Sequence, residues 1–197
     1  MQQLFLLLAF VITQYTCICQ TNDLSFFERE RINITKKGML VLGSWSAANI
    51  IVGAIGSNTS NREVHYFHQM NMIWSGANLL LAGLGYWGAT KENTNDLTLS
   101  RVLLHQNKVE KTFLFNAGLD VAYVTTGLYL TERSKRNADP SKLKGYGNSV
   151  MLQGGFLLLF DGVIYTLHQR HGKKLTNFTD KLTVLAVPAG LTLTYRL

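Results

Sequence analysis

The chain has 197 residues and a formal net charge of +7, from 19 Lys and Arg against 12 Asp and Glu. This length predicts a single domain. The basic residues lie in the connections between apolar segments and not as a stripe on one folded face, so we expect no nucleic-acid partner and instead expect attraction to anionic lipid headgroups. No catalytic motif in the sequence names a reaction, which favours a protein that is not an enzyme.

Residues 1–19 resemble a secretory signal peptide. A short apolar core from Leu4 to Ile12 precedes Cys17 and Cys19, and cleavage after Cys19 leaves Gln20 as the first mature residue. The first three residues include no basic side chain, so an uncleaved anchor is the alternative. Both interpretations place the following segment outside the cytoplasm. Cleavage also leaves no cysteine in the mature chain, which excludes disulfide and thiolate chemistry.

Residues 20–37 mix apolar and charged side chains and predict an interfacial amphipathic helix. Four apolar segments follow, each close to the roughly 20 helical residues needed to cross a bilayer. Apart from Asp120 and Asp161 in the last two, these segments carry no Asp, Glu, Lys or Arg. The pattern predicts an all-α membrane protein, a four-helix transmembrane bundle over residues 38–171. The predicted spans are 38–56, 64–89, 112–131 and 146–168.

Residues 172–197 are predicted to form a short irregular or extended tail. From Leu191 to Leu197 apolar and polar residues alternate with a period of two, which favours an extended strand. A fifth, broken helix is the alternative, because the apolar segment that begins near Lys181 is interrupted at Pro188.

The sequence gives two contradictory indications of how the chain is oriented in the membrane. An exported N-terminus places the turn after the first span and the loop after the third span in the cytoplasm. The larger share of the basic residues lies on the opposite face, so the positive-inside rule favours the reverse topology.

Polar side chains inside the predicted spans are the first candidate site. At 1.5 Å per helical residue, Asn49, Asn78, Asp120 and Asp161 fall at a similar depth, roughly 10–17 Å below the face that bears the mature N-terminus. Asn116 and Gln153 extend this layer. One interpretation is structural, because amides bond neighbouring helices. The other is a site for an ion, a proton or a small ligand, which intramembrane carboxyl groups often mark.

Histidines form the second candidate site. His65, His68 and Asn71 share one helix face at the start of the second span, but two histidines leave a zinc site incomplete. His105, His168 and His171 belong to the opposite face of the membrane, where a three-histidine site is conceivable. A whole membrane thickness separates the two groups, which disfavours a haem held between His68 and His168.

Small residues four apart predict close helix contacts. The pairs are Gly43 with Ala47, Gly85 with Ala89, and Gly118 with Ala122.

The chain is similar to an uncharacterised family, a domain of unknown function, of small multi-pass membrane proteins from Bacteroidetes-type bacteria. The similarity is carried by Gly38–Trp45, Asn49, Tyr66–Asn71, Trp74 and Asn78, and continues through Asn116, Asp120 and Gln153 to Gly190–Leu193. It implies a multi-pass protein of the bacterial inner membrane and brings no activity.

We therefore expect a non-enzymatic membrane module whose polar layer interacts with an ion, a proton or a small ligand. The alternatives are a membrane-embedded metal or redox protein that uses the clustered histidines, and a scaffold or partner subunit of a larger membrane complex. The expected partners are the lipid bilayer and either a second copy of the chain or another membrane protein. The sequence identifies no cofactor.

Overall fold

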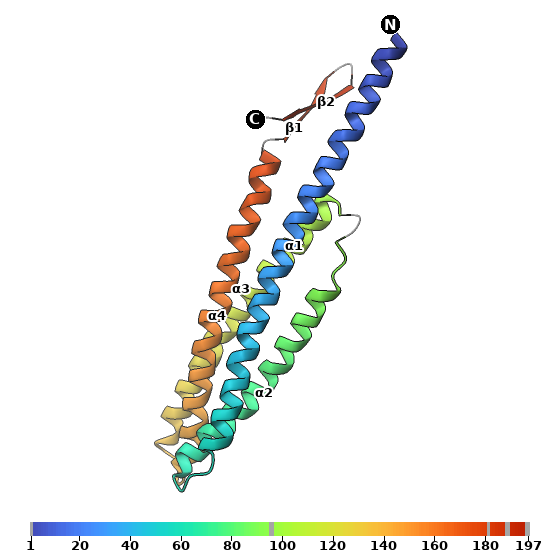
Figure 1. Cartoon of the computed structure of the whole chain (residues 1–197). Coiled ribbons are helices and arrows are strands. Elements are labelled where there is room, and N and C mark those ends of the chain that lie inside the picture. The colour runs from blue at the N-terminus through green and yellow to red at the C-terminus, as the bar shows by residue number, and fades with distance from the viewer. Residues whose placement is uncertain (1, 95–96, 181, 188–189, 196–197) are drawn as a thin grey trace.

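The computed structural model describes the backbone of residues 2–94, 97–180, 182–187 and 190–195, and the side chains of residues 24–94 and 97–175. The side chains of the predicted signal peptide and of most of the tail therefore lie outside the described residues. Four helices run up and down along an elongated bundle (Figure 1). They are α1 (Gln2–Gly56), α2 (Arg62–Lys91), α3 (Leu99–Ser134) and α4 (Pro140–Asp180), followed by the strands β1 (Leu182–Val187) and β2 (Gly190–Tyr195).

The starts of the helices are encoded locally. Asn61 caps α2, because its side-chain oxygen accepts from the backbone amides of Glu63 and Val64 at 3.0 and 3.3 Å. Thr98 caps α3 through its hydroxyl oxygen. Pro140 opens α4 at a position where a missing backbone N–H costs nothing. These caps set the short connections that make consecutive helices antiparallel.

The four predicted spans fall within the four helices. The predicted interfacial segment and the first span lie on one continuous helix, α1. The segment predicted as the tail begins as helix, because α4 continues to Asp180. The alternating C-terminal segment contributes β2, which pairs antiparallel with β1 from Leu182 opposite Tyr195 to Val187 opposite Gly190. A fifth helix is not formed at residues 182–187 and 190–195, the part of this tail that the structure describes.

The distribution of polarity is inverted relative to a water-soluble bundle. Large apolar side chains point outward on every helix, with Leu80, Phe115 and Leu159 between 64% and 73% exposed. Apart from Val102, the large side chains that are fully buried between the helices are polar, with Asn71 and Gln153 at 1% and 0% exposure. Soluble proteins bury apolar side chains and pair or expose their polar ones. The exterior of this bundle is thus suited to an apolar surrounding.

Two apolar clusters complete the interior. The central one consists of Leu42, Ala82, Phe113, Leu157, Phe160 and Ile164. The second joins the start of the described part of α1 to α3 and the end of α4, and consists of Leu24, Phe27, Leu97, Val102 and Leu175. Together they fix α1 and α4 against α3.

Glycines bring α3 and α4 into close backbone contact. A Cβ atom added to Gly127 would lie 2.6 Å from the carbonyl oxygen of Gly147, and one added to Gly147 would lie 2.7 Å from that of Gly127. Around Gly118, by contrast, no atom lies within 4 Å of an added Cβ. The small-residue pair Gly118 and Ala122 therefore does not mark a helix contact at Gly118.

Two helices are long and apolar enough to cross a membrane by length and composition. They are α1 from Leu24 onward and α4 up to Leu175. Over the described part of the chain, α2 and α3 do not reach the same composition. Two of the four predicted spans therefore meet this criterion.

Candidate functional site: buried polar groups and the cavities beside them

Side-chain amides from three helices form a continuous hydrogen-bonded chain, here called the amide network (Asn49, Asn71, Ser75 and Gln153). Asn71 Nδ2 on α2 donates to Asn49 Oδ1 on α1 at 2.8 Å. Gln153 Nε2 on α4 donates to Asn71 Oδ1 and, at 3.3 Å, to Ser75 Oγ. Gln153 Oε1 accepts from the indole N–H of Trp45 at 3.2 Å. The network joins α1, α2 and α4, and its amides bond to one another instead of to a ligand.

The carboxyl groups of Asp120 on α3 and Asp161 on α4 are buried and interact with each other. Two neighbouring carboxyl groups in a buried site favour a proton on one of them, because two adjacent negative charges repel. The pair is therefore chemically suited to holding a proton inside the bundle.

Both aspartates line a cavity of about 550 Å³, here called the inner cavity, together with Asn78 and Asn116. Two of the polar atoms around it are buried and lack a hydrogen-bond partner, namely Nδ2 of Asn78 and Oδ2 of Asp120. A buried polar atom without a partner is costly and uncommon. A donor and a carboxyl oxygen are thus left available beside an open space.

The predicted polar layer is accordingly divided in two. Asn49 and Gln153 belong to the amide network, whereas Asn78, Asn116, Asp120 and Asp161 line the inner cavity. Asn71, which the spacing grouped with His65 and His68, is instead the centre of the amide network.

The rings of His65 and His68 do not face a common position where one metal ion could bind both. A ring nitrogen of His65 lies 2.7 Å from the backbone oxygen of Ser57, so this side chain ties the start of α2 to the turn before it. The ring of His68 lies close to Gly56, and its Nδ1 atom is buried without a partner. Within the described residues, no group of side chains suited to a metal includes either ring.

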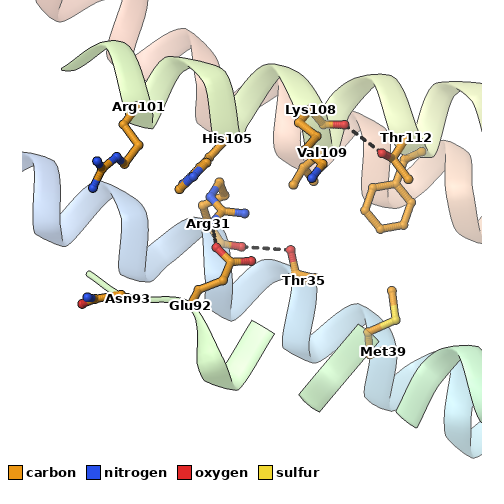
Figure 2. A pocket seen from close by; sticks show the side chains of 11 residues that line it. Arg31, Thr35, Met39, Glu92, Asn93, Arg101, His105, Lys108, Val109 and Thr112 are labelled. Atoms are coloured by element: carbon orange, nitrogen blue, oxygen red, sulfur yellow. Dashed lines mark hydrogen bonds and ion pairs between the residues drawn. The ribbon is translucent and has the colours of Figure 1, made fainter. Parts of the chain in front are cut away.

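A second polar group, the charged cluster (Glu28, Arg31, Glu92 and His105), lies where the end of α2 and the start of α3 meet α1. Figure 2 shows Arg31, Glu92 and His105. Glu28 and Arg31 are almost fully buried, and Arg31 donates to both carboxylate oxygens of Glu28, at 3.0 and 2.8 Å. Arg31 also pairs with Glu92 just after α2, and a ring nitrogen of His105 lies 2.6 Å from Glu28 Oε1. This bidentate, charge-assisted arrangement joins α1, the end of α2 and α3.

The charged cluster lies outside the predicted spans, and its contacts decide the protonation of Glu28. Burial alone raises the pKa of this carboxyl. The hydrogen bonds and positive charges of Arg31 and His105 outweigh burial, so the pKa of Glu28 lies below its ordinary value. Glu28 is therefore a carboxylate that is held in charged form by its partners.

The charged cluster also contains the set of potential metal ligands found among the described residues. One ligand atom each from Glu28, Glu92 and His105 lies within 4.8 Å of the others. The guanidinium of Arg31 already bonds both carboxylates. Because a fixed positive charge occupies the position where a cation would have to bind, we interpret the cluster as an ion-pair network.

The three histidines predicted to meet at this end face different partners. His105 faces Glu28, as above. His168 Nε2 lies 3.3 Å from the Thr35 hydroxyl, and the His171 ring stacks on Phe27 at a centroid distance of 3.9 Å. The rings do not converge on one point, so the predicted three-histidine site has no geometric support.

Sequence reasoning missed Glu28, Arg31 and Glu92 as members of a buried group. The spacing of Glu28 and Arg31 places them on one helix face, which was available as a signal. Because both side chains are charged, a position in contact with water at the membrane interface was the natural interpretation. Glu92 lies far away in the sequence, so no local pattern indicates that it pairs with them.

The comparison with known families gives one match. A family of unknown function, DUF6992, matches residues 41–162. This range contains all six residues of the predicted polar layer and Asn71, and it excludes Glu28, Arg31, His168 and His171. No curated protein and no solved structure matches the chain.

Proposed function

Because the chain belongs to the DUF6992 family of unknown function, no activity comes with its membership, and we propose one from its own residues. It is a multi-pass integral protein of the bacterial cell membrane, exported by its N-terminal signal. It is a non-enzymatic module whose inner cavity interacts with a proton, an ion or a small ligand. The observation that carries the proposal is a pair of buried carboxyl groups beside a cavity, inside a bundle with an apolar exterior.

The exterior supports the membrane location. A soluble monomer rarely exposes apolar patches larger than a few hundred Å². Here exposed apolar side chains occur on all four helices, for example Val52 on α1, Leu80 on α2, Phe115 on α3 and Leu159 on α4. In lipid such an exterior carries no penalty, while the buried amides supply the polar contacts between helices. The lipid bilayer is then the principal partner of the chain.

The inner cavity supports the functional interpretation. An intramembrane carboxyl group is expensive, and it marks an ion path, a proton site or a ligand site by default. The paired carboxyl groups of Asp120 and Asp161 favour a shared proton, and Asn78 adds an amide donor without a partner. The amide network is fully occupied by contacts within the protein, so we assign it a structural role.

The two rival functions receive less support. The histidines do not gather, which weakens a metal or redox role. A pure scaffold needs no carboxyl pair beside a cavity. A bundle of four helices is small for a transport protein, so a transport activity of this chain would require a homo-oligomer or a membrane-protein partner.

The test is isotope-edited infrared spectroscopy of the full chain in lipid nanodiscs, with ¹³C-labelled aspartate carboxyls. We expect a carbonyl band of a protonated carboxylic acid in the wild type. It should shift in frequency in Asp120→Asn and in Asp161→Asn and disappear in the double variant, while the helix content and the melting temperature stay close to those of the wild type.

Asp139→Asn is the matched control, because Asp139 lies in the loop before α4 and pairs with exposed Arg62. This variant should keep the band. Unfolding of both Asp120→Asn and Asp161→Asn, or a band that survives unchanged in the double variant, contradicts the proposal and favours a structural role of the pair.

A further inference from the structure

Two cavities adjoin within the bundle. The inner cavity is followed by a second cavity of about 620 Å³, here called the charged cavity, at the end of the bundle that holds Arg31 and His105. Met39, Thr112 and Phe113 line both of them. We therefore treat the two neighbouring cavities as one joined space that runs from the charged end into the predicted spans.

This space opens sideways between α2 and α3. The Cα atoms of these two helices stay more than 8 Å apart throughout the part of the chain that the structure describes, and α2 diverges from the α3–α4 pair toward Lys91 (Figure 1). The rings of Trp74 and Tyr123 meet edge to face at 4.8 Å and bridge the two helices at the deep end. Ile73 and Leu81, which line the space from α2, are exposed. An apolar molecule around the bundle can thus enter laterally.

The charged cavity is lined by more basic than acidic side chains. Its lining includes three cationic side chains, from Arg31, Arg101 and Lys108, and one carboxylate, from Glu92 (Figure 2). The Lys108 ammonium has no ion-pair partner among the described residues. A basic cluster at the membrane surface attracts anionic headgroups. The polar end of the joined space therefore complements a negative charge.

The length of the inner cavity matches one leaflet of a bilayer. It is lined on α3 from Thr112 to Tyr123, which at 1.5 Å per residue corresponds to about 16 Å. Half of a hydrocarbon core is about 15 Å. Most of the wall is apolar, with Met39, Leu42 and Leu157 among its side chains.

We propose that the joined cavities bind one anionic phospholipid of the surrounding bilayer. Its phosphate lies against Arg101 and Lys108, and one acyl chain extends between α2 and α3 toward Trp74. The inference rests on the proposed membrane location. It deepens the proposed function, because a bound chain also covers the Asp120–Asp161 pair from the lipid side.

The experiment uses Trp74 as a reporter in the full chain, in nanodiscs of zwitterionic lipid. Trp87→Phe removes an exposed indole and serves as the parent variant. Phospholipids with brominated acyl chains, either anionic or zwitterionic, are titrated as quenchers of tryptophan fluorescence. We expect half-maximal quenching at an about fivefold lower mole fraction of the anionic lipid, which is the preference that one basic side chain without an ion-pair partner, here Lys108, gives at a membrane surface.

Two variants locate the site. Arg101→Glu with Lys108→Glu should abolish the preference for the anionic lipid, and Arg133→Glu at the opposite end of the bundle is its control. Ala77→Phe fills the inner cavity from α2 and should reduce quenching by both lipids, whereas Leu80→Phe on the exposed face of α2 should not. The effect must disappear when Trp74 is also replaced by phenylalanine.

Equal quenching by the two lipids, or an anionic preference that survives the charge reversal, overturns the proposal and indicates ordinary boundary lipid only. No quenching by either lipid also overturns it, because a second copy of the chain or water then covers the space. The infrared test of the carboxyl pair does not depend on this result, so the two failures are distinguishable.

Discussion

Asn71 on α2 donates a hydrogen bond of 2.8 Å to Asn49 on α1, and its own amide oxygen accepts from Gln153 on α4. One side chain thereby links three helices at the most buried level of the bundle. An amide buried without a partner costs roughly 2–7 kcal/mol in an apolar medium. Each of the three amides is therefore stable in its position only while the others are present.

Replacing Gln153 by leucine should destabilise the bundle, because the indole N–H of Trp45 and the oxygen of Asn71 lose their partner. We expect the free energy of unfolding to fall by about 1–3 kcal/mol. Unfolding of the detergent-solubilised protein by a denaturing detergent measures it. Gln169→Leu, at an exposed position of the same helix, should have a much smaller effect, and equal losses in the two variants would contradict the account.

Removal of the Arg31 side chain should destabilise the bundle more than the Gln153→Leu substitution does. Arg31→Met leaves Glu28 buried as an unpaired carboxylate, which typically costs about 3–5 kcal/mol. The double variant with Glu28→Gln should regain part of this loss, because the uncompensated charge is gone. Arg29→Met is the control, since Arg29 is exposed on the same helix. A double variant as unstable as Arg31→Met alone would show that the two residues are not coupled.

The lowered pKa of Glu28 predicts an acid-dependent loss of stability. A carboxyl group whose pKa is lower in the folded than in the unfolded state stabilises the fold above the unfolded value, here about 4.5, and this contribution is lost as the pH falls through the lower, folded value. Melting temperatures of the wild type and of Glu28→Gln, measured between pH 7 and pH 3, provide the comparison. The difference between them should shrink below about pH 4.5. A constant difference would contradict the assignment.

The contact between Gly127 and Gly147 predicts a position-specific effect of alanine. In Gly127→Ala the new methyl group would lie 2.6 Å from a backbone oxygen of α4, so the helices must separate at a cost of about 1–3 kcal/mol. Gly118→Ala adds the same atom on the same helix where nothing lies within 4 Å, and it should leave stability unchanged or slightly higher. The two variants are compared by thermal unfolding in micelles, and equal losses would exclude the close α3–α4 approach.

The helices were predictable because charge-free segments of suitable length are visible directly in the sequence. The continuity of α1 was not. Glu28 and Arg31 look like the wet face of an interfacial helix, whereas in the structure they neutralise each other inside the bundle. Whether a charged pair faces water or a partner depends on contacts with α2 and α3, which lie far away in the chain.

The depth of the polar residues along the helices was predictable from the sequence, but the direction in which each side chain faces was not. Counting residues along each span placed four polar side chains at similar heights, with Asn116 and Gln153 extending the layer, but it left open which way each one faces. The spacing of Asn71, Ser75 and Asn78 does put them on one stripe of α2, and this stripe is buried. Grouping Asn71 with His65 and His68 missed it, because a three-residue spacing fits a metal pair and a packing stripe equally well.

The central claim is that this bundle presents an apolar exterior to lipid around a polar interior. Its most direct test is spin labelling at Val52, Leu80, Phe115 and Leu159, one on each helix, after Cys17 and Cys19 are replaced by serine. Collision rates with molecular oxygen and with a water-soluble relaxation reagent are measured in bilayers. The account predicts frequent collisions with oxygen and few with the aqueous reagent at all four positions. Ready access of the aqueous reagent to these positions would contradict it.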